Sequence, residues 1–209
     1  MIVGVPCDSV ETKRMTKHLL LDVPGPKYVR FAREATPVIT TNATPYVHGK
    51  ANVIRYRGAK PRFIDAFEHT LASDYKNENE DVTIVACGPS VPEAMRAAYI
   101  LKEEYGIETR IINMHTIKPL DNEAVVRAAA ETGCIVTAEE HQIGGLGNVV
   151  SSAILCGRGF YPHSLLFGMI GVKDRFGESG APWELVKEFE VAAEHIAQKA
   201  KELFNQKKK

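Results

Sequence analysis

From residue 82 onward, short β-branched runs alternate with helical segments, and this alternation constrains the fold more than any other feature. VTIVACG is the first run, TRIINMH and CIVTAEE follow after helical stretches, and SLLFGMIGV comes later. Strands that alternate with helices build a mainly parallel sheet covered by helices on both faces. We therefore expect an α/β fold, in which residues 82–209 form a three-layer α/β/α domain around a mostly parallel five-stranded sheet.

The helical segments carry their own start and stop signals. Ser90 and Glu93 have the spacing of a capping box, and Gly106 follows the last position of that helix. Asp121 and Gly133 mark the two ends of the next helix in the same way. A single helix near the C-terminus is predicted from an apolar stripe at three- and four-residue spacing: Val186, Phe189, Ala193, Ile196, Ala200 and Leu203.

Residues 1–45 do not follow the alternation. IVGVPCD and KYVRFARE predict strands, and the segment from Asp8 to Leu20 between them predicts a helix that Asp8 can cap. Two strands and one helix cannot bury a hydrophobic core of their own. We expect residues 1–45 to be the end of an incomplete domain that precedes the complete one.

Residues 46–81 predict a linker between these two parts. The stretch YVHGKANVIRYRGAKP is too polar and too interrupted by glycine to suggest a core element. RFIDAFEHTLASDY predicts a short amphipathic helix inserted in this linker, before the charged loop KNENED.

The amino-acid composition gives no support for nucleic acid, a membrane or a zinc ion as a partner of this chain. Lys and Arg together number 26, as do Asp and Glu, so no net charge favours nucleic acid or an anionic membrane. No apolar run approaches the roughly 20 residues that span a bilayer. The four cysteines show no CxxC spacing, which favours free thiols in a reducing cytoplasm over a disulfide framework or a zinc site.

The stretch IVTAEEHQIGGLGNVV, residues 135–150, has the composition of an active site at the end of a strand. Neighbouring carboxylates such as Glu139 and Glu140 can perform acid–base chemistry when their pKa values differ. Consecutive strand residues point to opposite faces, however, which favours one carboxylate capping locally and the other facing solvent. The glycines of GGLGN likewise fit a tight turn better than a nucleotide site. We interpret the stretch as an architectural corner.

Three long motifs resemble the C-terminal domain of transketolase over residues 82–205: GIETRIINMHTIKPLD, ETGCIVTAEEHQIGGLGNVV and GVKDRFGESGAPWEL. Upstream, VPCDSVETKR followed by GPKYVRFARE resembles the end of the pyrimidine-binding domain of the same enzymes. The β subunit of 2-oxoacid dehydrogenases shares this domain order, but EEHQIGGLGN and GESG are more similar to transketolase. Residues 60–81 are not part of the resemblance.

The resemblance implies transfer of a two-carbon ketol unit between sugar phosphates, with thiamine diphosphate and a divalent cation, in a dimeric enzyme. In the family, the cofactor, the metal and the activating glutamate are held by segments that this sequence does not contain. We therefore expect no catalytic, cofactor-binding or metal-binding residue here, and an isolated chain that is inactive and self-associates. An N-terminal transketolase portion or subunit would be its partner. The alternative is a non-catalytic interaction or regulatory module.

Arg33 is the expected substrate-binding residue. It ends the strand KYVRFAR, and the resemblance implies that an arginine here contacts the phosphate of the sugar. A guanidinium suits this role because it donates paired, charge-assisted hydrogen bonds. The alternative is a surface arginine paired with Glu34 or Asp8. For His115, which follows a strand, a hydrogen-bonded structural role is favoured over a ligand role.

Overall fold

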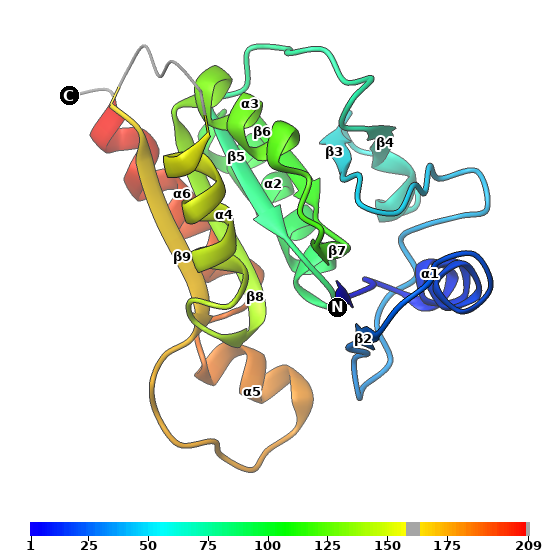
Figure 1. The fold of residues 1–209 in the computed structure, drawn as a ribbon. Helices are drawn as coiled ribbons and strands as arrows, with labels where there is room; N and C mark the ends of the chain where they lie inside the picture. Colours follow the sequence, from blue (N-terminus) through cyan, green and yellow to red (C-terminus); the bar gives the residue numbers. More distant parts are fainter. Residues whose placement is uncertain (158–163, 208–209) are drawn as a thin grey trace.

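The computed structural model describes residues 1–157 and 164–207, and its centre is a six-stranded sheet with the order β4-β3-β6-β5-β8-β9 (Figure 1). Its strands are β3 (Asn52–Tyr56), β4 (Phe67–Leu71), β5 (Val82–Ala86), β6 (Thr109–Asn113), β8 (Cys134–Gln142) and β9 (Leu166–Val172). Strands β6, β5, β8 and β9 are mutually parallel, whereas β3 runs antiparallel to both of its neighbours. The predicted α/β class is confirmed, but the sheet has six strands rather than five.

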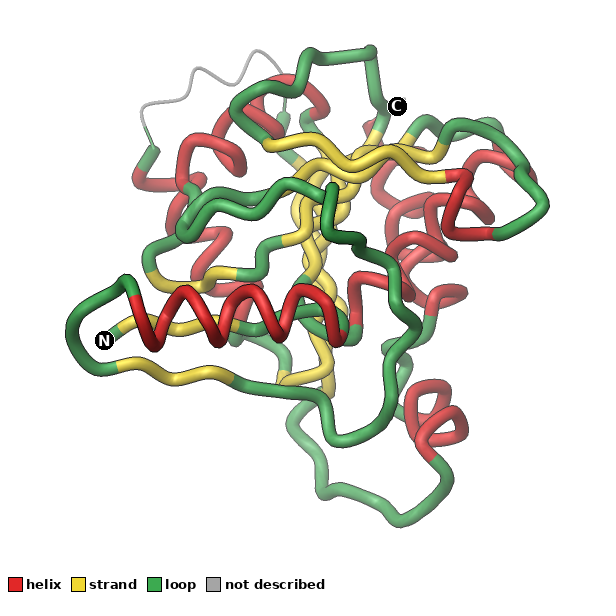
Figure 2. Tube along the Cα trace, turned by 90° about the vertical axis from the view of Figure 1, so that its right-hand side faces the viewer, coloured by secondary structure: helices red, strands yellow, loops and turns green. Residues whose placement is uncertain are grey.

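Helices cover both faces of this sheet (Figure 2). On one face lie α2 (Ser90–Tyr105) and α6 (Ala193–Lys207), and on the other lie α3 (Asn122–Thr132) and α4 (Leu146–Cys156). The strands supply both cores because successive side chains point in opposite directions. In β5, Ile84 belongs to the core under α2 and α6, and its neighbour Val85 belongs to the core under α3 and α4.

A smaller sheet of order β2-β1-β7 joins the N-terminal segment to the rest of the chain. Its strands are β1 (Ile2–Gly4), β2 (Lys27–Val29) and β7 (Thr116–Lys118), and α1 (Ser9–Leu21) connects the first two. Strand β7 comes from between β6 and α3, so the C-terminal part of the chain provides one of the three strands. The division of the chain into three parts at residues 45 and 81 stays a prediction.

The interpretation of residues 46–81 as linker missed two strands. Strands β3 and β4 lie there, and the expected amphipathic helix is reduced to a 3-10 turn, η1 (Phe63–Ala66). The polar composition of this segment led to the wrong prediction because Arg55 is buried within β3. Its guanidinium donates hydrogen bonds to the Thr109 carbonyl and to Glu108. A charged residue can occupy a buried strand position when such partners are present.

A second buried arginine, on the strand next to β3, joins the sheet to the segment before β5. Arg110 on β6 has a side chain only 1% exposed, and it donates to Glu80 at 2.7 Å and to Glu131 at 2.5 Å. Its guanidinium also lies over the ring of Tyr75, which donates a hydrogen bond to Glu80. Burial raises the pKa of Glu80, but the hydrogen bonds from Tyr75 and Arg110 outweigh burial and hold it below its usual value.

Two predictions about helix ends are confirmed and one is wrong. Gly106 and Gly133 end α2 and α3 in the left-handed conformation, with φ of 66° and 60°. The capping box does not form, since Ser90 is already helical. The Glu93 carboxylate instead accepts a hydrogen bond from the Ala193 N–H, at the start of α6, at 2.9 Å.

The single C-terminal helix expected from the apolar stripe is two helices. Helix α5 (Pro182–Glu188) ends before α6 begins at Ala193, and Glu190 between them has a φ of 56°. A left-handed residue interrupts a helix whatever the apolar spacing around it. Among residues 1–157 and 164–207, none of the helices is long and apolar enough to cross a lipid bilayer.

Candidate functional site

A cleft of about 560 Å³, here called the Arg33 cleft, opens at the carboxyl ends of β8 and β9. One wall is formed by residues 32–37, which follow β2, and the facing wall carries Trp183, Val186 and Phe189 from α5 and its end. Parallel-sheet proteins bind ligands beyond the carboxyl ends of their strands. This position makes the Arg33 cleft the candidate site.

Arg33 lines this cleft with a side chain that is 96% exposed. Its Nε lies 3.9 Å from a carboxylate oxygen of Glu34, a long ion pair that contributes little at such an exposed position. Asp8 is not its partner, because that carboxylate is buried and accepts from the Ile39 and Thr40 N–H groups. The guanidinium is therefore placed to meet an anion that enters the cleft, and its role as a phosphate contact stays a prediction.

Two acidic side chains that line the Arg33 cleft have cationic partners. Glu140 accepts a hydrogen bond from Arg30 at 2.9 Å. Glu93 pairs with Arg96 at 2.6 Å and accepts from the N-terminus of α6. These pairs lower the local negative charge that would oppose an anion near Arg33.

Glu139, the residue beside Glu140, faces the protein interior and caps α4. Its carboxylate, 3% exposed, accepts hydrogen bonds from Leu146 N–H at 2.8 Å and Gly147 N–H at 3.1 Å. A side chain at Gly147 would place its Cβ 2.7 Å from the Met169 sulfur, so this glycine allows close helix–strand packing. Glu139 therefore has the local capping role that the sequence favoured. That residues 135–150 take no part in catalysis stays a prediction.

The sequence did not predict a buried polar cluster that joins α1 to β6. The Glu11 carboxylate accepts hydrogen bonds from Cys7 N–H at 2.7 Å and from the Asn113 amide at 2.8 Å. Burial raises the pKa of Glu11 above its usual value, although these hydrogen bonds oppose the shift. Asp8 caps α1 as predicted, accepting from the Glu11 N–H at 2.9 Å. Only this local cap had a signal in the sequence.

His115 is a structural histidine in this arrangement. It is fully buried, its Nδ1 lies 2.9 Å from the Thr116 hydroxyl, and its ring stacks on Tyr46 with centroids 4.8 Å apart. Burial, helped by the nearby His48, lowers the pKa of His115 to about 3. It is therefore neutral at physiological pH, and it lies apart from the residues that line the Arg33 cleft.

Comparison with known protein families decides the relationship. The model of the family described as Transketolase, C-terminal domain, matches residues 72–196. The chain belongs to this family. The transketolase resemblance carried by the three sequence motifs is thereby confirmed. The expectation that residues 60–81 lie outside the resemblance is wrong for residues 72–81, which the family match includes.

Two curated transketolase subunits are similar to this chain. The apulose-4-phosphate transketolase subunit from Phocaeicola vulgatus is 38% identical over 152 residues, which are 72% of this chain and 41% of that protein. The 6-deoxy-6-sulfo-D-fructose transketolase subunit SqwH of a Clostridium species is 35% identical over 208 residues, 99% of this chain and 56% of that protein. The chain thus spans about half the length of these transketolase relatives.

A solved structure agrees with the fold. The structure described as a split gene transketolase, inactive beta4 tetramer, superimposes with a TM-score of 0.76 at 28% identity, covering 99% of this chain and 58% of that one.

Membership of the transketolase family implies that the assembled enzyme uses thiamine diphosphate with a divalent cation. Within residues 1–157 and 164–207, no group of three or more His, Cys, Asp or Glu side chains is arranged to hold a metal ion. The described residues alone therefore do not fit the cation of this cofactor.

Proposed function

We propose that this chain is the C-terminal part of a thiamine diphosphate-dependent transketolase and has no ketol transfer activity by itself. An N-terminal transketolase portion or subunit would hold the cofactor, its cation and the catalytic groups. The chain would complete the assembly and contribute Arg33 to the sugar-binding site. The family match, together with the lack of a cation site among the described residues, supports this division of roles.

The single observation that carries the proposal is the exposure of Arg33 at the mouth of a cleft beyond the carboxyl ends of β8 and β9. The substrates would be sugars with an anionic group. The names of the two relatives support this class, since one specifies a 4-phosphate and the other a 6-sulfo sugar. A guanidinium can donate two parallel hydrogen bonds to either group.

Two further features of the proposal are self-association and a cytoplasmic location. The similar split-gene chain is described as a tetramer, which supports a homo-oligomer here, with the dimer as its expected unit. Cys7, Cys87 and Cys134 are buried free thiols, which supports a reducing compartment.

The proposal is tested by reconstitution with the N-terminal subunit of a split transketolase. Residues 1–209 alone should show no thiamine diphosphate binding by calorimetry and no ketol transfer, whereas the mixture should turn over. In the mixture, Arg33→Ala should raise the KM for a phosphorylated sugar by about 10- to 100-fold, the equivalent of one charge-assisted contact. The KM for the same sugar without its phosphate should change much less.

Arg62→Ala is the matched control, because Arg62 is also an exposed arginine but pairs with Asp65 at 2.7 Å, outside the Arg33 cleft. Its kinetics should equal those of the wild type. If Arg33→Ala leaves the KM for phosphorylated sugars unchanged, Arg33 does not contact the substrate. If the mixture never turns over, the alternative of a non-catalytic interaction module is favoured.

A further inference from the structure

Residues 30–40, here called the Arg33 segment, follow β2 without forming a helix or a strand. Residues 31–38 within it are exposed or half-buried. In the part of the chain that the structure describes, no hydrogen bond joins residues 31–38 to another segment, and their only ion pair is the long contact between Arg33 and Glu34. The stretch that carries Arg33 is therefore held in place at its two ends.

Both ends are attached to the N-terminal part of the chain. At one end, the Asp8 carboxylate accepts hydrogen bonds from Ile39 N–H at 2.8 Å and from Thr40 N–H at 2.6 Å. At the other end, the Arg30 N–H donates to the Gly4 carbonyl at 2.9 Å. None of these bonds reaches α5, which forms the opposite wall of the Arg33 cleft.

The Arg30 side chain joins the Arg33 segment to the C-terminal part of the chain. Its guanidinium donates to Glu140, at the exposed end of β8, at 2.9 Å, although the two residues lie 110 positions apart. Among residues 1–157 and 164–207, no other hydrogen bond or ion pair makes this connection for the Arg33 segment. Three residues of chain span at most about 11 Å, so fixing Arg30 confines Arg33 to one region of the cleft wall.

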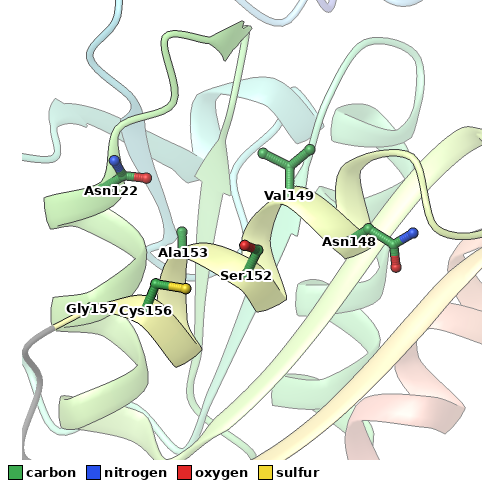
Figure 3. A pocket seen from close by; sticks show the side chains of 7 residues that line it. All are labelled: Asn122, Asn148, Val149, Ser152, Ala153, Cys156 and Gly157. Atoms are coloured by element: carbon green, nitrogen blue, oxygen red, sulfur yellow. The ribbon is translucent and has the colours of Figure 1, made fainter.

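The location of Arg33 matters because this side chain distinguishes its cleft from another hollow of similar size. A hollow of about 550 Å³ lies between α4 and Asn122 at the start of α3 (Figure 3). Its polar side chains, which include Asn148, Ser152 and Cys156, carry no cation. Of these two hollows, the Arg33 cleft is the one that offers a guanidinium to an anionic sugar.

We propose that Arg30 and Glu140 are positioning residues, whose ion pair holds the Arg33 guanidinium across the cleft from α5. The inference rests on the proposed function, in which Arg33 binds the anionic group of the sugar. A partly exposed ion pair contributes little to the stability of a fold. It can still preorganise a site, because a site that is in its binding arrangement for only a fraction of the time has an affinity reduced by that fraction.

Variants of each partner in the reconstituted enzyme separate positioning from a simple effect of charge. If the pair positions Arg33, Arg30→Gln and Glu140→Gln should each raise the KM for a phosphorylated sugar by about two- to fivefold. If the charges acted only through their field, Glu140→Gln would instead lower this KM, because it removes a negative charge near Arg33. The exchanged pair, Arg30→Glu with Glu140→Arg, should restore a KM near that of the wild type. In an Arg33→Ala background, Glu140→Gln should have no further effect.

Glu202→Gln is the matched control. Glu202 is 43% exposed and pairs with Lys199 on α6 at 3.0 Å, outside the Arg33 cleft, whereas Glu140 is 41% exposed. The control should leave the KM unchanged. Trypsin cleavage after Arg33 in the isolated chain provides a second measurement, without turnover. Glu140→Gln should be cleaved there about two- to fivefold faster than the wild type or Glu202→Gln, since its Arg33 segment is less firmly held.

The outcomes distinguish this inference from the proposed function. A Glu140→Gln variant that lowers the KM or leaves it unchanged, while Arg33→Ala raises it, would overturn the inference and leave the proposed function intact. Cleavage after Arg33 at the wild-type rate in Glu140→Gln would also overturn it. An unchanged KM in Arg33→Ala would contradict the sugar contact of the proposed function, and this inference with it.

Discussion

Glu139→Gln tests the structural role of the corner at residues 135–150. The Glu139 carboxylate uses one oxygen for Leu146 N–H and the other for Gly147 N–H. Glutamine has nearly the same shape but replaces one oxygen by an NH₂ group, which cannot accept either bond. The substitution therefore removes one charge-assisted hydrogen bond and the negative charge at the N-terminus of α4, without creating a cavity.

The magnitude follows from these two losses. A hydrogen bond to a charged group contributes about 1.5–3 kcal/mol. The charge adds about 0.3–1 kcal/mol through the helix dipole. We expect the free energy of unfolding to fall by about 2–4 kcal/mol, which for a chain of this length lowers the Tm by about 4–16 °C.

Glu140→Gln is the control, since it makes the same chemical change at the adjacent residue. Glu140 is exposed and its ion pair with Arg30 is worth at most about 1 kcal/mol. Both variants should be unfolded in urea and followed by circular dichroism. A Glu139→Gln variant within about 0.5 kcal/mol of the wild type, or no more destabilised than Glu140→Gln, would refute the capping role. In the reconstituted enzyme Glu139→Gln should keep the wild-type kcat below its melting temperature, and a large loss there would revive the acid–base interpretation.

Two further predictions concern buried charge. Glu80→Gln should lower the free energy of unfolding by about 3 kcal/mol, because Arg110 stays buried with one carboxylate fewer. Glu78→Gln, at the exposed end of the same cluster, should lower it by less than about 1 kcal/mol. Urea unfolding of both variants measures the difference. His115 has a pKa of about 3 in the folded chain against about 6.5 when unfolded, so its contribution to stability is complete above pH 6.5 and is lost as the pH falls toward 3. The free energy of unfolding, measured in urea between pH 6.5 and 4.5, should therefore fall by up to about 1.4 kcal/mol per pH unit because of this group. An equally steep fall in His115→Gln would exclude His115 as the source.

The alternation of strands and helices could be predicted because it depends on local patterns, namely apolar runs and the residues at helix ends. Strand β5 is apolar on both faces, and α3 has Asp121 and Gly133 at its ends, so neighbouring residues alone specify these elements. Strand β3 could not be predicted in this way. Arg55 is a core residue because Glu80 and Glu108 lie beside it. These partners are distant in the sequence, so no local pattern predicts the pairing.

The same limit applies to the caps and to the site. Glu93 has capping-box spacing with Ser90, but its carboxylate accepts a hydrogen bond from the N-terminus of α6 instead. Which of these two partners the carboxylate binds is decided only by the tertiary structure. The capping role of Glu139 could be predicted because the N–H groups that it caps follow it closely in the chain. The cleft beside Arg33 could not be predicted, since its other wall is α5, which follows about 150 residues later.

The position of β3 between β4 and β6 has a practical consequence for anyone who shortens this chain. A fragment that begins at residue 82 would correspond to the complete domain suggested by the sequence, yet it would lack β3 and β4. Strand β6 would then become an exposed edge, with the backbone groups that pair with Asn52–Arg55 open to other molecules and Arg110 deprived of Glu80. Unpaired strand edges recruit strands from neighbouring copies, so such a fragment should aggregate more readily than the longer chain.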